Sequence, residues 1–137
     1  MRLWHKDLIP YLPRQQLIAQ WRELCAIAGS IAKKGTSNHI LVNKVLSSRG
    51  DFYSYCNIVV GELKRRNYKV SEKAMKTCFD NILANNNFET NSTHFEIFPD
   101  WHNNRYLKQC LFNLQEKYDC GGIPDDEWKI IQENFNV

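Results

Sequence analysis

The chain has 137 residues, of which 43% are hydrophobic, which is enough for one compact core and too few for two. No segment approaches the roughly 20 apolar residues of a membrane span, and the N-terminal residues lack the apolar stretch of a secretory signal. The formal net charge of +3 is too small to indicate a nucleic-acid partner by itself. We therefore expect one domain over residues 1–137, located in the cytoplasm and not in contact with a membrane.

A first helix is expected from Pro13 to about Ile31, because the apolar residues recur with the spacing of one helix face. Pro13 suits a first helical position. Trp21 lies on this stripe, which favours packing, whereas Glu23 lies off its centre and should sit at the edge of a cleft. The apolar stripe consists of Leu17, Trp21, Leu24, Cys25 and Ala28.

Residues 33–50 are rich in turn-forming residues, and Ile40 to Leu46 within them could form either a short helix or an extended stretch. Asp51 is expected to cap a second helix that ends at Arg65 and Arg66, where cations favour the helix dipole. Asn67 is then a suitable left-handed stop.

Ser71 is expected to cap a third helix with an inward stripe that includes Leu83, and residues 85–93 read as an exposed loop. A fourth helix follows Asp100, and Pro124 opens a short last helix that carries Trp128. No useful length of sequence alternates with period two. The sequence therefore predicts a compact all-α fold of about four to five helices with an ordered N-terminal segment.

Neither the cysteines nor the histidines are spaced as disulfide partners or metal ligands. The five cysteines are odd in number and include no Cys-x-x-Cys pair, so we expect reduced and mostly buried thiols. The histidines, His5, His39, His94 and His102, are scattered, and we expect most of them to be polar surface residues. We therefore expect neither a metal site nor any other cofactor.

Basic residues crowd the first fifty positions, where only Asp7 and Glu23 oppose them. This distribution favours contact with DNA phosphates, with a merely solvated basic face as the alternative. Trp4, beside Arg2, could equally stack on a base or pack in the core. The basic residues are Arg2, Lys6, Arg14, Arg22, Lys33, Lys34, Lys44 and Arg49.

Several short motifs resemble the phage-type endonuclease V family, the pyrimidine-dimer-specific glycosylases and abasic-site lyases, and look closest to a bacterial branch of it. They are MRLWH at residues 1–5, LIP at 8–10, LPRQQL at 12–17 and WREL at 21–24, and the similarity returns over residues 52–68. The resemblance implies that the N-terminal α-amine attacks C1′ of a damaged nucleotide and that one glutamate assists. Glu23 matches that glutamate.

The resemblance also implies that Arg22 contacts phosphate or the lesion, and Gln15 matches a further family position. Because Arg2 is not small, we expect Met1 to be retained, so that the nucleophile is the Met1 amine. An α-amine has a pKa of about 7.7 to 8.0, so more of it is unprotonated at neutral pH than of a lysine. The free amine can then form an imine with the sugar.

The expected partner is damaged double-stranded DNA, bound by a monomer. The candidate DNA contacts are Arg2, Trp4, Lys6, Arg14, Gln15, Arg22, Lys33 and Lys34, with Arg65 and Arg66 as weaker candidates. Two alternatives stay open: a non-catalytic module that binds distorted duplex, and a helical protein-interaction domain. The preferred lesion also stays open.

Overall fold

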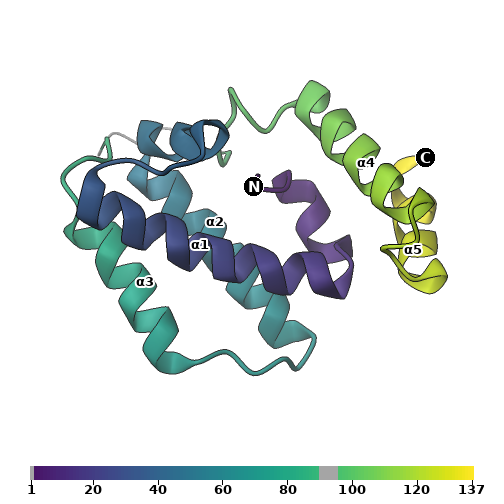
Figure 1. Cartoon of the computed structure of the whole chain (residues 1–137), viewed down its shortest axis with the longest axis horizontal. Helices are drawn as coiled ribbons and strands as arrows, with labels where there is room; N and C mark the ends of the chain where they lie inside the picture. The colour runs from purple at the N-terminus through teal and green to yellow at the C-terminus, as the bar shows by residue number, and fades with distance from the viewer. Residues whose placement is uncertain (1, 90–95) are drawn as a thin grey trace.

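The computed structural model describes residues 2–89 and 96–137, and within them the chain forms helices and no strand (Figure 1). The prediction of an all-α fold is confirmed. The helix count is higher than expected, because two 3₁₀ helices join the five α-helices in the described part of the chain. The elements are η1 (Lys6–Tyr11), α1 (Arg14–Lys34), η2 (Ile40–Ser47), α2 (Arg49–Arg65), α3 (Glu72–Ala84), α4 (Asn104–Asp119) and α5 (Asp125–Phe135).

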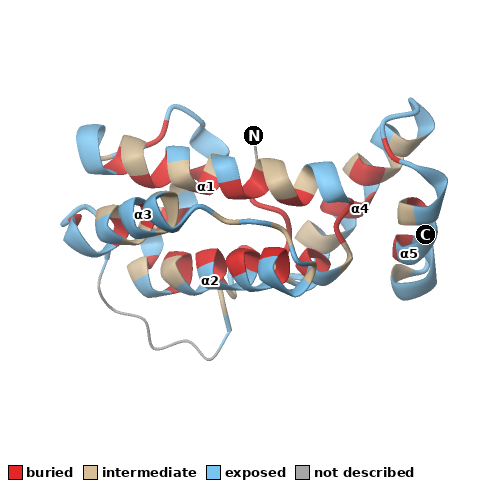
Figure 2. Ribbon diagram, turned by 90° about the horizontal axis from the view of Figure 1, so that it is seen from below, coloured by how far each residue is buried: buried red, intermediate tan, exposed pale blue. Residues whose placement is uncertain are grey.

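The long helix α1 packs against α2 and α3, and the chain start runs between these helices and α4 (Figure 1). In Figure 2 the buried residues of α1 and α2 lie toward the space between the two helices. One hydrophobic cluster contains residues from Leu3 near the start to Ile131 in α5. No helix in the described part of the chain has the length and apolarity needed to cross a membrane. The organisation as one domain stays a prediction.

Helix α1 follows the predicted stripe. Leu17, Leu24 and Ile31 recur every seven residues, which is about two helical turns, and each is fully buried. Trp21 is buried as predicted. The helix ends at Gly35, whose φ of +78° is the left-handed conformation that glycine adopts most easily.

Ser48, rather than Asp51, caps α2. The Ser48 Oγ accepts a hydrogen bond from the Asp51 N–H at 3.0 Å, as an N-cap serine does. Asp51 is instead a buried residue of the first turn, and its carboxylate accepts a hydrogen bond from the Phe98 N–H at 3.1 Å. At the other end Asn67 has a φ of +63°, which confirms the predicted left-handed stop.

One other expectation is wrong and a second holds only in part. Leu83 is 56% exposed, because α3 turns Cys78 and Ile82 inward and leaves Leu83 on its outer side. In the expected loop after α3, residues 86, 87 and 89 are exposed, whereas Asn85 and Phe88 are buried, and Phe88 stacks on Phe52 at a ring distance of 5.7 Å. Residues 90–93 of that expected loop lie outside the described residues.

The C-terminal helices begin close to the predicted positions. Asn103 caps α4, and its Oδ1 accepts a hydrogen bond from the Tyr106 N–H at 3.0 Å. Pro124 precedes α5 as predicted, and Trp128 of that helix is buried. The α5 side chain of Glu127 accepts a hydrogen bond from the Arg14 N–H at 2.8 Å, which connects α5 to the first turn of α1.

Candidate active site

A pocket of about 480 Å³ lies along one side of α1 and contains Glu23. Helical spacing explains why α1 lines it, because residues three, four and seven positions apart share a helix face. It brings together the sequence candidates Arg14, Gln15, Arg22 and Glu23, and α4 adds the ammonium of Lys117. The lining residues are Trp4, Arg14, Gln15, Gln16, Ile18, Ala19, Arg22, Glu23 and Lys117. We call this the Glu23 pocket.

Glu23 is the carboxylate of this pocket and is half-buried. Burial raises its pKa, and the nearby positive charges of His39 and Lys117 oppose that rise. A raised pKa makes a carboxylate a better proton acceptor, which is the property that a general base needs.

A second hollow of about 520 Å³ adjoins the Glu23 pocket and shares Arg14, Ile18 and Arg22 with it. It extends to the segment after α2, which adds the exposed side chain of Lys69. The two hollows together form a groove with four cationic side chains, Arg14, Arg22, Lys69 and Lys117. We call it the α1 groove.

The chain start is held next to Glu23 by the buried side chain of Gln20. The Gln20 Nε2 donates to the Arg2 carbonyl oxygen at 3.2 Å and to Glu23 Oε2, also at 3.2 Å. One amide group thus touches both the backbone of the second residue and the candidate catalytic carboxylate. Met1 itself lies outside the described residues.

Three further side chains bind the backbone of residues 3–6. The Tyr106 hydroxyl donates to the Leu3 carbonyl oxygen at 2.6 Å. The Tyr55 hydroxyl lies 2.6 Å from the Trp4 carbonyl oxygen, and His102 Nδ1 accepts from the Lys6 N–H at 3.0 Å. Burial raises the pKa of both tyrosines, so both hydroxyls stay protonated and able to donate. We call Gln20, Tyr55, His102 and Tyr106 the N-terminal clamp.

The expectation of surface histidines is wrong for His5 and His102, which are 2% and 4% exposed. The two rings stack at 5.2 Å, and His102 also stacks on Tyr106 at 5.2 Å. Burial, with smaller effects of the His5 and Lys6 charges, lowers the pKa of His102 to about 3. The ring is therefore neutral at physiological pH, which leaves Nδ1 free to accept the Lys6 N–H. His39 is exposed as expected, and His94 lies outside the described residues.

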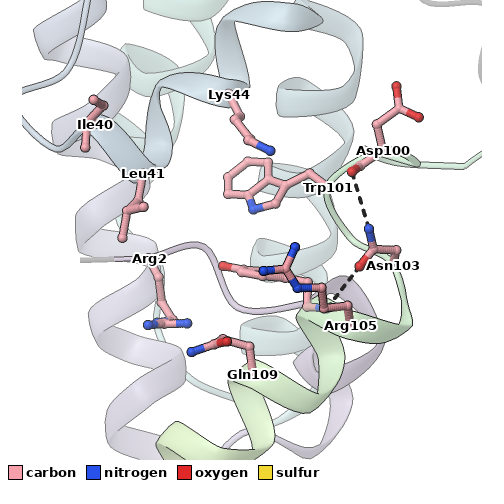
Figure 3. A pocket seen from close by; sticks show the side chains of 10 residues that line it. Arg2, Ile40, Leu41, Lys44, Asp100, Trp101, Asn103, Arg105 and Gln109 are labelled. Carbon is pink, nitrogen blue, oxygen red and sulfur yellow. Dashed lines mark hydrogen bonds between the residues drawn. The ribbon is translucent and has the colours of Figure 1, made fainter.

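Arg2 lines a different pocket, of about 560 Å³, on the α4 side of the chain start. In Figure 3 the Arg2 side chain points toward Gln109 of α4, while Lys44 lies next to the indole of Trp101. The lining residues are Arg2, Ile40, Leu41, Lys44, Asp100, Trp101, Asn103, Arg105, Tyr106 and Gln109. Arg2, Arg14 and Arg22 thus lie in two separate hollows and not in one.

Three of the sequence candidates are engaged by other groups of the protein. Trp4 is 7% exposed and belongs to the core, so we assign it to packing and no longer to base stacking. The Lys6 side chain is 17% exposed, and its ammonium lies 3.8 Å from the Glu96 carboxylate. Arg66 is likewise bound to protein groups, including Glu62 and the Leu12 carbonyl oxygen.

Lys33 and Lys34 are exposed at the far end of α1, about 15 Å along the helix axis from Glu23 at 1.5 Å per residue. Arg65 is exposed and shares the Glu62 carboxylate with Arg66. The structure therefore brings Arg14, Gln15 and Arg22 to Glu23, and it leaves the two lysines and Arg65 outside the pocket.

Sequence reasoning missed Lys117 and the contacts that the clamp residues make with the chain start. For Gln20 a signal existed, because a polar residue between Leu17 and Leu24 on the apolar stripe of α1 must find buried hydrogen-bond partners. For Lys117 no signal existed, since α4 meets α1 only in the folded chain. Among the described residues, no group of three or more His, Cys, Asp or Glu side chains is gathered as a metal site requires.

Comparison with known protein families gives a match for the N-terminal half of the chain. A family model described as pyrimidine dimer DNA glycosylase matches residues 1–76. The matched region includes the chain start, the whole of α1 and Glu23, and it ends within α3. Searches of curated proteins and of solved structures gave no significant match.

Proposed function

The chain belongs to the pyrimidine dimer DNA glycosylase family, and we propose that it excises damaged pyrimidines from double-stranded DNA and cleaves the abasic product. In this proposal the N-terminal α-amine is the nucleophile and Glu23 is the assisting carboxyl group. The supporting observation is the Gln20 amide, which contacts the Arg2 carbonyl oxygen and Glu23 Oε2 at 3.2 Å each. The α-amine belongs to the residue before Arg2, and one residue spans about 3.8 Å.

The proposed reaction uses only the amine and the carboxyl group. The amine lone pair forms a bond to C1′ while the bond from C1′ to the base breaks and the base leaves with those electrons. The nitrogen then loses a proton, and its lone pair forms the C=N bond while the C1′–O4′ bond breaks and O4′ takes up a proton, which gives a protonated imine. Removal of a C2′ proton then expels the 3′ phosphate and cuts the strand.

Glu23 would assist at two of these steps. As a carboxylate it would stabilise the positive charge of the imine, and it could accept the proton that leaves C2′. The raised pKa of Glu23 supports the second role, because a more basic carboxylate is the better proton acceptor. Positive charges at Arg22 and Lys117 would favour the unprotonated amine by like-charge repulsion.

The α1 groove is the proposed site of the damaged strand. The exposed side chains of Arg14, Arg22, Lys69 and Lys117 would contact phosphates, and Gln15 would contact the nucleotide at the pocket. Because C1′ is hidden in a duplex, binding must bend the DNA and turn a nucleotide outward. Arg2, Lys33 and Lys34 remain proposed contacts beyond the groove, and we propose that the protein acts as a monomer.

Borohydride trapping tests this function, because reduction converts the imine into a stable covalent link between protein and DNA. Tag-free protein with its own first residue is mixed with duplex that contains either an ultraviolet-induced dimer or an abasic site. We expect a trapped adduct with the dimer-containing duplex. We expect Glu23→Gln to lower the rate of strand cleavage by about 10²- to 10⁴-fold.

A protein with one extra residue before Met1 is the matched control, because it retains every side chain and moves only the amine. It should bind DNA and give no adduct. A wild-type protein that binds damaged duplex without forming an adduct would overturn the catalytic proposal and favour the non-catalytic binding module. Adduct formation by the extended protein would show that another amine is the nucleophile.

A further inference from the structure

The amide of Gln20 is the one group of the N-terminal clamp that contacts both the Arg2 backbone and the Glu23 carboxylate in the described part of the chain. We propose that Gln20 is a positioning residue, which holds the Glu23 carboxylate in place beside the start of the chain. This inference rests on the proposed function, in which the N-terminal amine and Glu23 act together.

The hydrogen bonds of Gln20 determine how its amide is oriented. Its Oε1 accepts from the Trp4 N–H at 2.7 Å and lies 3.0 Å from the Tyr55 hydroxyl. Its Nε2 uses both hydrogens, one toward the Arg2 carbonyl oxygen and one toward Glu23 Oε2. Rotating the amide by 180° would place Oε1 against the Arg2 carbonyl oxygen and Glu23 Oε2. It would also place Nε2, which is a donor, against the Trp4 N–H, which is another donor. Only the observed orientation satisfies the Trp4 N–H, the Arg2 carbonyl oxygen and the Glu23 carboxylate together.

Burial makes this arrangement rigid. Gln20 and Tyr55 are both fully buried, and Trp4 is nearly so, so none of these groups can exchange a partner for water without disturbing the core. Glu23 is only half-buried and would otherwise sample several rotamers. A buried neutral N–H donor fixes one oxygen of the carboxylate and adds no charge to the site.

The same amide also determines where the chain start lies. Through Arg2 and Trp4 it binds the backbone on both sides of Leu3, whose own carbonyl oxygen accepts from Tyr106. Displacing a reacting group by about 1 Å can slow a reaction about 100-fold. We therefore infer that loss of the Gln20 N–H bonds would slow catalysis without removing a group that touches the substrate.

Gln20→Glu is the sharpest test, because it conserves the shape of the side chain and replaces only the Nε2 donor with an oxygen. The retained oxygen can still accept from the Trp4 N–H, whereas the second oxygen faces the Arg2 carbonyl and the Glu23 carboxylate. Two carboxylates in contact share one proton, which is bound more readily as the pH falls. The shared proton restores a hydrogen bond to Glu23.

The readout is the single-turnover rate of strand cleavage as a function of pH. We expect Gln20→Glu to be about 100-fold slower than wild type at pH 8, with this ratio shrinking as the pH falls toward 5. Gln20→Met has a similar length and no donor, so it should be slow at every pH. A residue that merely supports folding would give no recovery in acid.

Gln132→Glu is the matched control, because it makes the same substitution at an exposed position of α5 away from the pocket. It should cleave at the wild-type rate at every pH. If Gln20→Glu or Gln20→Met cleaves at the wild-type rate across the pH range, the positioning role is wrong. If wild-type protein itself forms no adduct, the result contradicts the proposed function and not the positioning role of Gln20.

A measurement on wild-type protein covers the case in which the variants do not fold. In ¹⁵N–¹H spectra, the side-chain amide signal of Gln20 should shift as Glu23 titrates, with a midpoint above the usual glutamate range. The shift should vanish in Glu23→Gln. A Gln20 amide signal whose chemical shift stays constant while Glu23 titrates would overturn the inference.

Discussion

At the scale of single residues, His102 shows how burial sets a protonation state. Its ring is enclosed by aromatic side chains, and Nδ1 accepts the Lys6 N–H, so the folded protein requires the neutral form. Its Nε2 has no hydrogen-bond partner within the described residues. The pKa of about 3 in the folded state compares with about 6.5 in an unfolded chain.

This difference predicts a pH-dependent stability. Between pH 6.5 and 3 the unfolded chain binds a proton at His102 that the folded protein does not bind, so stability falls as the pH falls through that window. We expect the free energy of unfolding, measured with urea, to drop by about 1 kcal/mol from pH 7 to 5.5 on account of this residue. His102→Asn, whose Oδ1 can still accept the Lys6 N–H, should lose that part of the drop.

His39→Asn is the control for this measurement, because His39 is exposed. It should keep the wild-type dependence on pH. If His102→Asn and wild type lose equal stability over this interval, the histidine is not neutral in the folded protein as the structure indicates.

At the scale of elements, hydrogen bonds from Arg66 connect the C-terminal end of α2 to the segment that leads into α1. The Arg66 guanidinium donates to Glu62 Oε1 at 2.8 Å, to the Leu12 carbonyl oxygen at 2.8 Å and to the Pro10 carbonyl oxygen at 3.2 Å. Burial would raise the pKa of Glu62, but the hydrogen bonds from Arg65 and Arg66 outweigh it and lower that pKa. The carboxylate is thus ionised and holds both arginines.

Arg66 and Arg65 differ in what they bind besides Glu62, and this difference predicts unequal effects. We expect Arg66→Ala to destabilise the protein by about 2 to 3 kcal/mol in urea unfolding, because it removes hydrogen bonds from a charged, largely buried donor. Arg65→Ala should cost much less, since that side chain is 65% exposed and binds Glu62 alone. Equal losses would contradict a structural role specific to Arg66.

At the scale of the whole molecule, the fold collects cations from distant parts of the chain along one side of α1. Arg14 and Arg22 come from α1 itself, Lys69 from the segment after α2, and Lys117 from α4. A groove with several cations and few opposing charges concentrates a polyanion by long-range attraction. This arrangement would give the proposed DNA-binding surface a local positive charge in a chain whose net charge is only +3.

Binding to duplex DNA should therefore weaken steeply as salt is added. Each phosphate neutralised contributes a slope of about −0.9 to a plot of log Kobs against log salt concentration. Arg22→Gln should lower the magnitude of this slope by about 1 in fluorescence-anisotropy titrations. Lys76→Gln is the control, because Lys76 lies on α3 and pairs with Asp80, and it should keep the wild-type slope. An unchanged slope for Arg22→Gln would place the DNA elsewhere.

Local spacing was sufficient to predict much of the helical framework. The stripe of α1, the stop at Asn67 and the start of α5 after Pro124 followed from periodicity and turn chemistry, which depend on neighbours a few residues away. The predictions failed where a nearby alternative competed, as when Ser48 capped α2 in place of Asp51. The side of α3 that faces inward also depends on α1, which explains the error at Leu83.

The sequence by itself determined the helical class, the family motifs at the chain start and the choice of Glu23. Only the tertiary structure decided that His102 and Tyr106 bind the backbone of residues 3–6, that Lys117 lies at the Glu23 pocket, and that Gln20 joins Arg2 to Glu23. The reason is physical. Helical periodicity predicts which side of a helix is buried, but the partner on that side can lie as far as 113 residues away, as Glu127 does from Arg14, and packing alone selects it.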